Sequence, residues 1–229
     1  MAANHYLKKT PWDKRTFNIE TYEVVSEEEG ALKETENRKG HFTLKADPHS
    51  PKGLLEAYGF YYVDTLLQPE CKAVRLKSFE KEGIIITKEG DLDSILIIAD
   101  EAFAHGRFHR DQNVPSPLAD LRYVRWLKDL FHQDQVYFLY YQKELAGFIG
   151  YEGNKILLMG VSETYRGAGL SKPFLYTACR QLISEGHDKL ITSISAINQA
   201  SLNLFYSLGF RVRGAVDVYH KFNDEIEEE

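Results

Sequence analysis

The chain has 229 residues, a formal net charge of −6 and 43% hydrophobic residues, enough for one large core or two small ones. Its Lys and Arg residues are scattered, whereas a nucleic-acid surface needs a basic face, so nucleic-acid binding is not expected. No run approaches the ~18 apolar residues that span a bilayer, which also argues against a membrane partner.

The two cysteines are too few for a disulfide framework, and the N-terminal segment "MAANHYLKKTPWDKRTF" lacks the apolar region of a secretory signal. Disulfide-poor proteins are typical of reducing compartments. We therefore expect a cytoplasmic protein.

The first part of the chain predicts a small α/β domain of strands and one clear helix. The helix is expected to begin with Ser50 as its N-cap and Pro51 in its first turn, and to stop at Gly59. In chain order we expect a strand over 15–25, a charged helix or loop over 26–40, a strand over 41–47, the helix over 50–60 and a strand over 61–68.

The second part predicts helices alternating with strands. Asp91 is the expected N-cap of its first helix, and two turn signals within 135–161 separate three antiparallel strands. In order we expect a helix over 91–104, a polar loop over 105–117, a helix over 118–132, the three strands, a helix over 171–186, a strand over 189–195, a helix over 199–210 and a strand or strand pair over 211–222.

Two segments, "LLEAYGFYYVD" and "LFYSLGFRVRG", both predict a helix, a Gly-Phe pair and a strand. Gly-Phe after a helix is a common C-cap with a hydrophobic anchor, so the similarity has a simple explanation. The alternative is a degenerate repeat of one half-fold.

The segment "VSETYRGAGLSKPF" joins an apolar strand ending at Val161 to a helix beginning near Leu170. The first N–H groups of a helix lack intrahelical partners and carry the positive end of its dipole. Gly167 and Gly169 permit close approach of a ligand, and Arg166 adds a cation with several donors. The turn is therefore suited to a diphosphate, although a plain connector remains an alternative. It satisfies neither the P-loop pattern nor the dinucleotide Gly-x-Gly-x-x-Gly pattern.

The order of this turn, a helix, a strand, Asn198 and a helix ending in Gly-Phe resembles the GNAT N-acetyltransferase superfamily over roughly residues 83–222. The superfamily motif is Gln/Arg-x-x-Gly-x-Gly/Ala; Arg166 and Gly169 match it, and Ser171 replaces the last small residue. The resemblance implies an α/β (α+β) GNAT fold, with a mostly antiparallel mixed sheet flanked by helices, and acetyl-CoA as co-substrate.

The resemblance also implies a set of residues that hold acetyl-CoA, through the pyrophosphate turn, the preceding strand and the Asn-led helix. These residues are Val161, Arg166, Gly167, Ala168, Gly169, Leu170, Ser171, Asn198 and Phe205. Gly160 is a candidate for a β-bulge that frees edge groups near Val161, with a plain packing glycine as the alternative.

Three shorter segments, "PWDKRTFNIETYEV", "LLEAYGFYYVD" and "AFAHGRFHRD", resemble TDP-fucosamine acetyltransferase and its relatives. Those two-domain enzymes acetylate the amino group of a nucleotide-linked deoxy sugar. This resemblance implies a degenerate GNAT-like domain over 1–82, a GNAT acetyltransferase domain over 83–229, and an amino-sugar nucleotide as acceptor.

Superfamily members usually protonate the leaving thiolate with a tyrosine, but Phe205 stands at that position and Tyr206 follows it. Tyr206 is the candidate acid; an ordinary aromatic residue is the alternative. The relatives carry an acidic residue where Asp64 stands, so Asp64 is the candidate base, against a solvated aspartate at a strand end. Glu152 and His109 are fallback bases.

Arg107 and His109 lie in the predicted polar loop and are candidate substrate-binding residues for sugar or phosphate oxygens. A plain solvated loop is the alternative, and no ligand set supports a metal there. Rival functions are acetylation of another small-molecule or protein amine, and non-catalytic binding of acyl-CoA. An exposed edge strand near the C-terminus would allow a homodimer.

Overall fold

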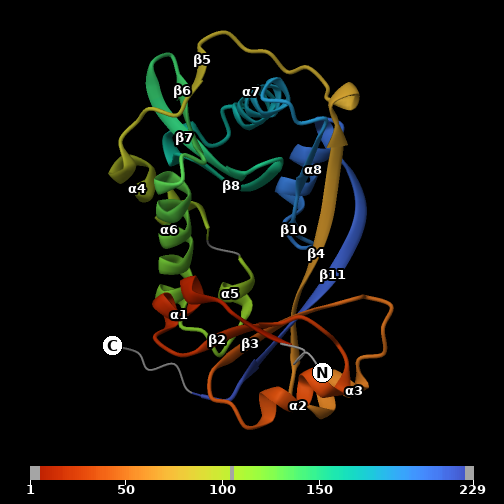
Figure 1. Cartoon of the computed structure of the whole chain (residues 1–229). Coiled ribbons are helices and arrows are strands. Elements are labelled where there is room, and N and C mark those ends of the chain that lie inside the picture. The colour runs from red at the N-terminus through yellow and green to blue at the C-terminus, as the bar shows by residue number, and fades with distance from the viewer. Residues whose placement is uncertain (1–5, 104–105, 225–229) are drawn as a thin grey trace. The chain divides into compact units, whose positions relative to one another are not determined.

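The computed structural model describes residues 6–103 and 106–224, which fall into two compact units (Figure 1). Within the described residues, unit 1 comprises 6–66, 106–122 and 215–224, and unit 2 comprises 67–103 and 123–214. The chain therefore passes between the units several times. The sequence-based division at residue 82 stays a prediction about domains.

Unit 1 contains strands in the order β1-β2-β3-β11. The β2–β3 pair is parallel, whereas β1–β2 and β3–β11 are antiparallel. The strands are β1 (Leu7–Lys9), β2 (Thr21–Val24), β3 (His41–Ala46) and β11 (Arg211–Phe222), of which residues 215–222 belong to this unit.

The helices of unit 1 are α1 (Pro11–Phe17), α2 (Glu29–Glu36), α3 (Gly53–Ala57) and α5 (Arg107–Arg110). One cluster of the core gathers Leu32 of α2, Leu55 of α3 and Phe42 of β3. A second gathers Phe17 of α1 and Phe108 of α5. Each short helix thus buries one or two apolar side chains against the strands.

Three predictions in this unit are wrong. The helix expected from Ser50 begins only at Gly53, with Lys52 as its N-cap. The other two concern α1 and α5, which lie in contact. The expected strand over 15–25 begins only at Thr21, because Pro11 starts a helix that continues to Phe17 and ends where Asn18 adopts a left-handed φ of 55°. The segment predicted as a polar loop over 105–117 contains α5, with Phe108 and Asp111 buried. Tertiary packing of Phe17 against Phe108 explains both, and this contact is not visible in local sequence patterns.

Unit 2 contains strands in the order β4-β9-β8-β7-β6-β5, and β10 pairs with β4. The β8–β9 pair is parallel, while β4–β9, β7–β8, β6–β7 and β5–β6 are antiparallel. The strands are β4 (Tyr61–Lys72, from residue 67 in this unit), β5 (Ile84–Thr87), β6 (Val136–Tyr141), β7 (Glu144–Glu152), β8 (Lys155–Val161), β9 (Lys189–Thr192) and β10 (Ile194–Ser195).

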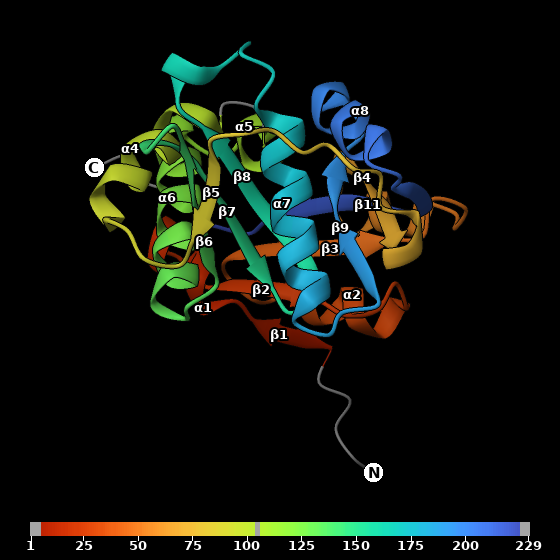
Figure 2. The same cartoon turned by 90° about the horizontal axis from the view of Figure 1, so that it is seen from above.

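Helices cover both faces of these strands (Figure 2). Alternate residues of β6 face opposite ways: Leu139 packs with Phe174 of α7, whereas Phe138 packs with Leu127 of α6. The helical segments are η1 (Ala73–Arg75), α4 (Leu92–Ala102), α6 (Ser116–His132, from residue 123 in this unit), η2 (Glu163–Tyr165), α7 (Ser171–Ser184) and α8 (Gln199–Ser207). The predicted fold class, a mostly antiparallel mixed sheet flanked by helices, is confirmed.

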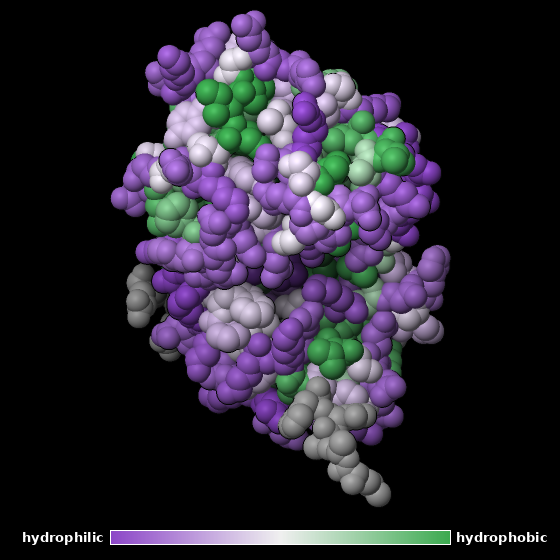
Figure 3. Space-filling view, turned by 45° about the horizontal axis from the view of Figure 1, so that its top comes forward, coloured by the Kyte–Doolittle hydropathy of each residue, from purple (hydrophilic) through white to green (hydrophobic). Residues whose placement is uncertain are grey.

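The described surface carries isolated apolar residues, with Val74 the most exposed at 92%. On the face seen in Figure 3, hydrophobic surface forms small patches separated by hydrophilic side chains. Among the residues searched, no helix is long and apolar enough to span a membrane.

Candidate functional site

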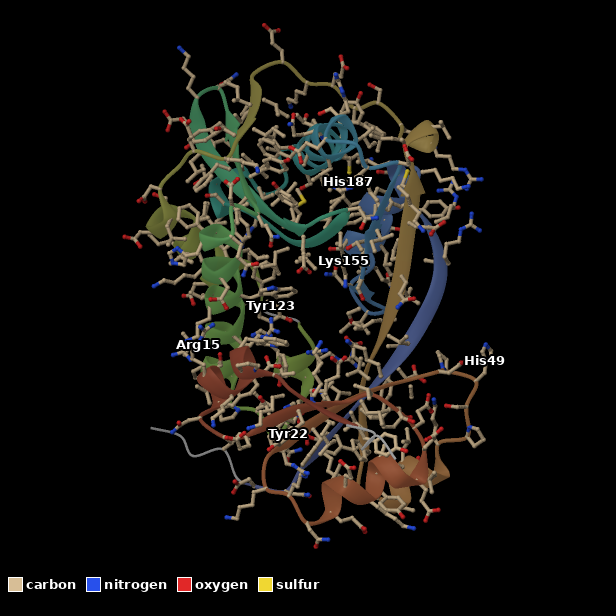
Figure 4. The ribbon with its side chains drawn as sticks, in the orientation of Figure 1. Arg15, Tyr22, His49, Tyr123, Lys155 and His187 are labelled. Atoms are coloured by element: carbon tan, nitrogen blue, oxygen red, sulfur yellow. The ribbon has the colours of Figure 1, made fainter. Side chains whose placement is uncertain are left out.

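The first residues of β8 pair with the last residues of β9, and the two strands do not pair further along β8. The parallel ladder has two residue pairs, Lys155 with Ile191 and Ile156 with Thr192, while β8 continues to Val161. The Thr192 hydroxyl donates to the Ile156 carbonyl at 2.9 Å and so ends the ladder with a side chain. Figure 4 labels Lys155, at the end of β8 where the two strands still pair. Beyond Ile156, β8 has no β9 residue opposite it.

A β-bulge lies at this point of separation. Along the β7–β8 ladder, Gly150 pairs with Leu158 and Tyr151 with Ile156, so Leu157 is the extra residue of β8. A bulge bends its strand and increases the local twist, which re-aims the edge groups that follow it. Gly160, the sequence candidate for such a bulge, lies in regular register, so the alternative of a packing glycine is the correct one.

Gly160 is needed for packing instead. It pairs in register with Phe148, and a Cβ at residue 160 would lie 2.5 Å from the Phe148 ring. Its neighbour across the ladder, Gly147, is equally constrained, since a Cβ there would lie 2.2 Å from the Gly160 carbonyl oxygen. The two glycines therefore let β7 and β8 approach closely around a buried aromatic ring.

The turn after β8 leaves the N-terminus of α7 uncapped. Gly167 and Gly169 have φ of 78° and 71°, which favour glycine, and a Cβ at either would meet nothing within 4 Å. No side chain caps α7, whose N-cap residue is Leu170. Within the described residues, no hydrogen bond is recorded from the N–H groups of Gly167, Gly169 or Leu170. These open donors at the positive end of a helix of 14 residues suit an anion.

Arg166 braces this turn. Its Nε donates to the Val161 carbonyl at 3.1 Å and its Nη2 to the Glu101 carbonyl at 3.2 Å, so it links the end of β8 to α4. A guanidinium has five donors, which leaves it capacity for a ligand oxygen as well. Ala168 lies within the same turn, its N–H donating to the Tyr165 carbonyl, and Ser171 is the first residue of α7.

The helix that follows β10 places three further candidates. Asn198 is the N-cap of α8, its Oδ1 accepting from Ser201 N–H at 3.0 Å. Phe205 is buried and packs edge-on against Phe210 at 4.9 Å between ring centroids. Tyr206 is 57% exposed, with the Arg211 guanidinium 4.1 Å from its ring centroid. The one-residue step from Phe205 to Tyr206 thus separates a core side chain from a surface side chain.

Asp64 is buried in unit 1, with 1% of its surface exposed, so the alternative of a solvated strand-end aspartate is wrong. Its Oδ1 accepts from Arg110 at 2.5 Å and from Thr65 N–H at 2.9 Å. Buried carboxylates are tolerated when paired in this way.

His109 and Arg107 are held by local contacts. His109 Nδ1 accepts from Gly106 N–H, so its Nε2 carries the proton and donates to Asp120 at 2.7 Å. Arg107 stacks over the Phe108 ring at 4.7 Å. These contacts position α5, and no substrate role for either residue is apparent from them.

Unit 1 also contains a buried His-Asp-His cluster that the sequence analysis missed. His220 Nδ1 lies 2.6 Å from Asp111, whose carboxylate also accepts from Tyr61 at 2.9 Å. The Nε2 atoms of His41 and His220 have no hydrogen-bond partner among the described residues. One potential ligand atom from each of the three residues lies within 4.8 Å of the others. No spacing signal links these positions, because β3, β11 and the end of α5 bring them together.

The two histidines are held neutral by their surroundings. Burial lowers the pKa of His41 well below its ordinary value, and the neighbouring His220 lowers it further. Burial also lowers the pKa of His220, although Asp111 opposes the shift. Burial acts to raise the pKa of Asp111, but the hydrogen bonds from His220, the Asn113 backbone and Tyr61 outweigh this, so the pKa lies below normal.

In comparisons with known proteins, the model of one family matches part of the chain, and solved structures share its fold. Residues 101–210 match the model of the acetyltransferase (GNAT) family. A mycothiol acetyltransferase of Corynebacterium efficiens is 31% identical over 96 residues, covering 40% of this chain and 32% of its own length. One from Corynebacterium glutamicum strain R is 30% identical over 109 residues, covering 45% and 36%. The chain thus spans about a third of the length of these relatives.

Two solved structures share the fold. A GNAT-family protein from Novosphingobium aromaticivorans has a TM-score of 0.60 at 18% identity, over 97% of this chain and 91% of its own. A GCN5-related N-acetyltransferase from Sphaerobacter thermophilus has a TM-score of 0.58 at 14% identity, over 82% and 61%. At these identities the likeness concerns the fold alone, which is the GNAT fold.

Proposed function

Since residues 101–210 match the GNAT acetyltransferase family and the chain has the GNAT fold, we propose that the protein is an acetyl-CoA-dependent N-acetyltransferase. Acetyl-CoA is the co-substrate of GNAT acetyltransferases. The observation that carries the proposal is the uncapped N-terminus of α7 directly beyond the point where β8 separates from β9.

The proposed site holds acetyl-CoA by two backbone features. The N–H groups of Gly167, Gly169 and Leu170 bind the pyrophosphate, with the two glycines leaving room for its oxygens. The β8 edge beyond Ile156, which faces no β9 residue, pairs with the pantetheine arm as an added strand would. Neither feature requires a special side chain, so sequence divergence elsewhere leaves it intact.

The proposed chemistry is direct transfer to an amine. The neutral amine attacks the thioester carbonyl carbon, a backbone N–H near Val161 stabilises the oxyanion, and the C–S bond breaks to release the thiolate. Asp64 stays the proposed acceptor of the amine proton, as the sequence resemblance implies. The Tyr206 hydroxyl protonates the thiolate.

We propose a nucleotide-linked amino-deoxy sugar as the acceptor, with His109 and Arg107 as candidate binding residues. The segments that resemble sugar-nucleotide acetyltransferases support this choice. A second acceptor class, a thiol-bearing small molecule with a free amine, is favoured by the relatives named mycothiol acetyltransferases. Non-catalytic binding of acyl-CoA is the remaining candidate, favoured by Phe205 at the usual tyrosine position and its burial.

An acceptor screen tests these alternatives. CoA release is measured with a panel of TDP-4-amino-4,6-dideoxy sugars, amine precursors of low-molecular-weight thiols, and simple amines. The proposal predicts the highest kcat/KM on a sugar nucleotide. Turnover confined to the thiol precursors or simple amines would reject the sugar nucleotide. Binding of acetyl-CoA without turnover on any amine would favour the non-catalytic alternative.

A further inference from the structure

Unit 2 contains a hollow of about 220 Å³ that is lined by Arg75, Lys77, Gly209 and Arg211. Three of these four residues are cationic, and none is acidic. The hollow lies where η1 and the segment after it meet the end of α8 and the start of β11. It therefore has no residue in common with the turn between β8 and α7.

The cations of this hollow lack acidic partners. Within the described residues, no ion pair is recorded for Arg75, Lys77 or Arg211. Nearby Arg213 does have one, with Glu70 at 3.4 Å. Three like charges in one concave site repel one another, and an anion placed among them relieves that repulsion. The chain as a whole has a net charge of −6, so this cluster is locally positive on a protein whose net charge is negative.

The backbone around the hollow is fixed. Lys77 N–H donates to the Leu208 carbonyl at 2.9 Å, which joins the two segments. Gly209 has φ of 105°, and a Cβ there would lie 2.2 Å from the Arg75 carbonyl oxygen, so only glycine permits this approach. The site is thus formed by a close contact between segments more than 130 residues apart in sequence.

The Arg211 side chain is also oriented before any ligand arrives. Its Nη1 donates to the Phe210 carbonyl at 2.7 Å, and its guanidinium lies over the Tyr206 ring. These contacts use one edge and one face of the guanidinium and leave further donors available. A pre-oriented cation loses less side-chain entropy on binding than a free one does.

From these observations we infer that Arg75, Lys77 and Arg211 form an anion-binding site for a phosphoryl group, separate from the acetyl-CoA turn. The volume supports a small group, because pockets for drug-sized ligands span roughly 300–1,000 Å³. A phosphate or diphosphate fits this description, with its charge matched by three cations.

The test uses inorganic pyrophosphate and backbone amide NMR signals of the full chain, with and without saturating CoA. We expect pyrophosphate to shift the amides of Lys77, Gly209 and Arg211, and to do so in the presence of CoA. Shifts at Gly167 to Ser171 belong to the acetyl-CoA turn and are recorded separately. The outcome at the hollow therefore does not depend on whether the proposed function holds.

Variants assign the binding to the side chains. Arg75→Gln and Lys77→Gln each remove one charged hydrogen-bonding group and are expected to weaken pyrophosphate binding at the hollow about tenfold. Lys128→Gln, an exposed lysine on α6 of the same unit, makes the same change in net charge and should leave the affinity unaltered. The inference is overturned if the hollow's amides do not shift, or if Lys128→Gln weakens binding as much as the other two.

Discussion

Individual side chains in unit 1 set how the protein responds to acid. His41 and His220 are both fully buried, and the pKa of each lies below the ordinary value because burial disfavours the charged ring. Arg107 lowers both further, whereas Asp111 and Asp13 act in the opposite direction on His220. The unfolded chain therefore takes up protons at these positions more readily than the folded chain does.

We predict that the free energy of unfolding falls as pH drops below the ordinary histidine pKa of about 6.5, by up to about 1.4 kcal/mol per pH unit for each histidine. Above that pH the histidines are neutral in both states and contribute no slope. His41→Phe should reduce the acid-side slope, since its aromatic neighbours accommodate a ring. Urea titrations from pH 5 to 7.5 test this, and an unchanged slope in the variant would contradict it.

Tyr206 is an exposed residue of α8 whose proposed role in the reaction can be tested by one substitution. Its hydroxyl is the proposed acid, while its ring is held by Arg211. Tyr206→Phe keeps the ring and removes the hydroxyl, so we predict unchanged thermal stability and a fall in kcat of about tenfold to a hundredfold. The expected loss is at the low end for general acids because a thiol pKa of about 8.5 makes thiolate a fair leaving group. A variant with full kcat would exclude this role.

Helix-capping residues can be predicted from the sequence, whereas buried pairs of distant residues cannot. Asp91 and Asn198 were predictable as helix caps or starts, because capping depends on neighbours within three residues. The Asp64–Arg110 pair and the His41–His220 contact were not, because each joins positions far apart in sequence. The buried histidines give no local signal of their burial.

At the scale of elements, the end of the pairing between β8 and β9 is the feature that we propose makes room for acetyl-CoA. The bulge at Leu157 and the Thr192 hydroxyl act on neighbouring residues of β8. The bulge changes the direction of the strand, and the hydroxyl donates to the Ile156 carbonyl. Sequence predicted both strands and the glycine turn correctly from apolar runs and turn residues. It left open whether Gly160 marks a bulge or a packing contact, because the Phe148 ring that requires this glycine lies on the neighbouring strand.

We predict that Thr192→Val destabilises the fold by about 1–3 kcal/mol, since it leaves the Ile156 carbonyl without its hydroxyl partner in a buried place. Because the same bond ends the ladder, the KM for acetyl-CoA should rise as well. Thr192→Ser keeps the hydroxyl and serves as the matched control, with a smaller change in both quantities. If the two variants changed the denaturant midpoint and the KM equally, a specific role of the hydroxyl would be contradicted.

At the scale of the whole molecule, each of the two compact units is built from segments that are not consecutive in the sequence. Sequence periodicity finds helices and strands one after another, and the resemblance to two-domain enzymes implied a division at residue 82. Compact units depend on contacts between distant segments, and here 106–122 and 215–224 belong with the first 66 residues. Such membership has no local sequence signature.

The central claim is that the turn from Gly167 to Ser171 binds acetyl-CoA, and calorimetric titration tests it most directly. Gly167→Ala and Gly186→Ala each place a Cβ at a residue with positive φ and open space, so both should cost similar folding stability, about 1–2 kcal/mol. Only residue 167 lies at the proposed cradle; Gly186 follows the other end of α7. We predict that the wild type and Gly186→Ala bind acetyl-CoA alike, whereas Gly167→Ala binds at least about tenfold more weakly. No binding by the wild type, or equal loss in both variants, would contradict the account.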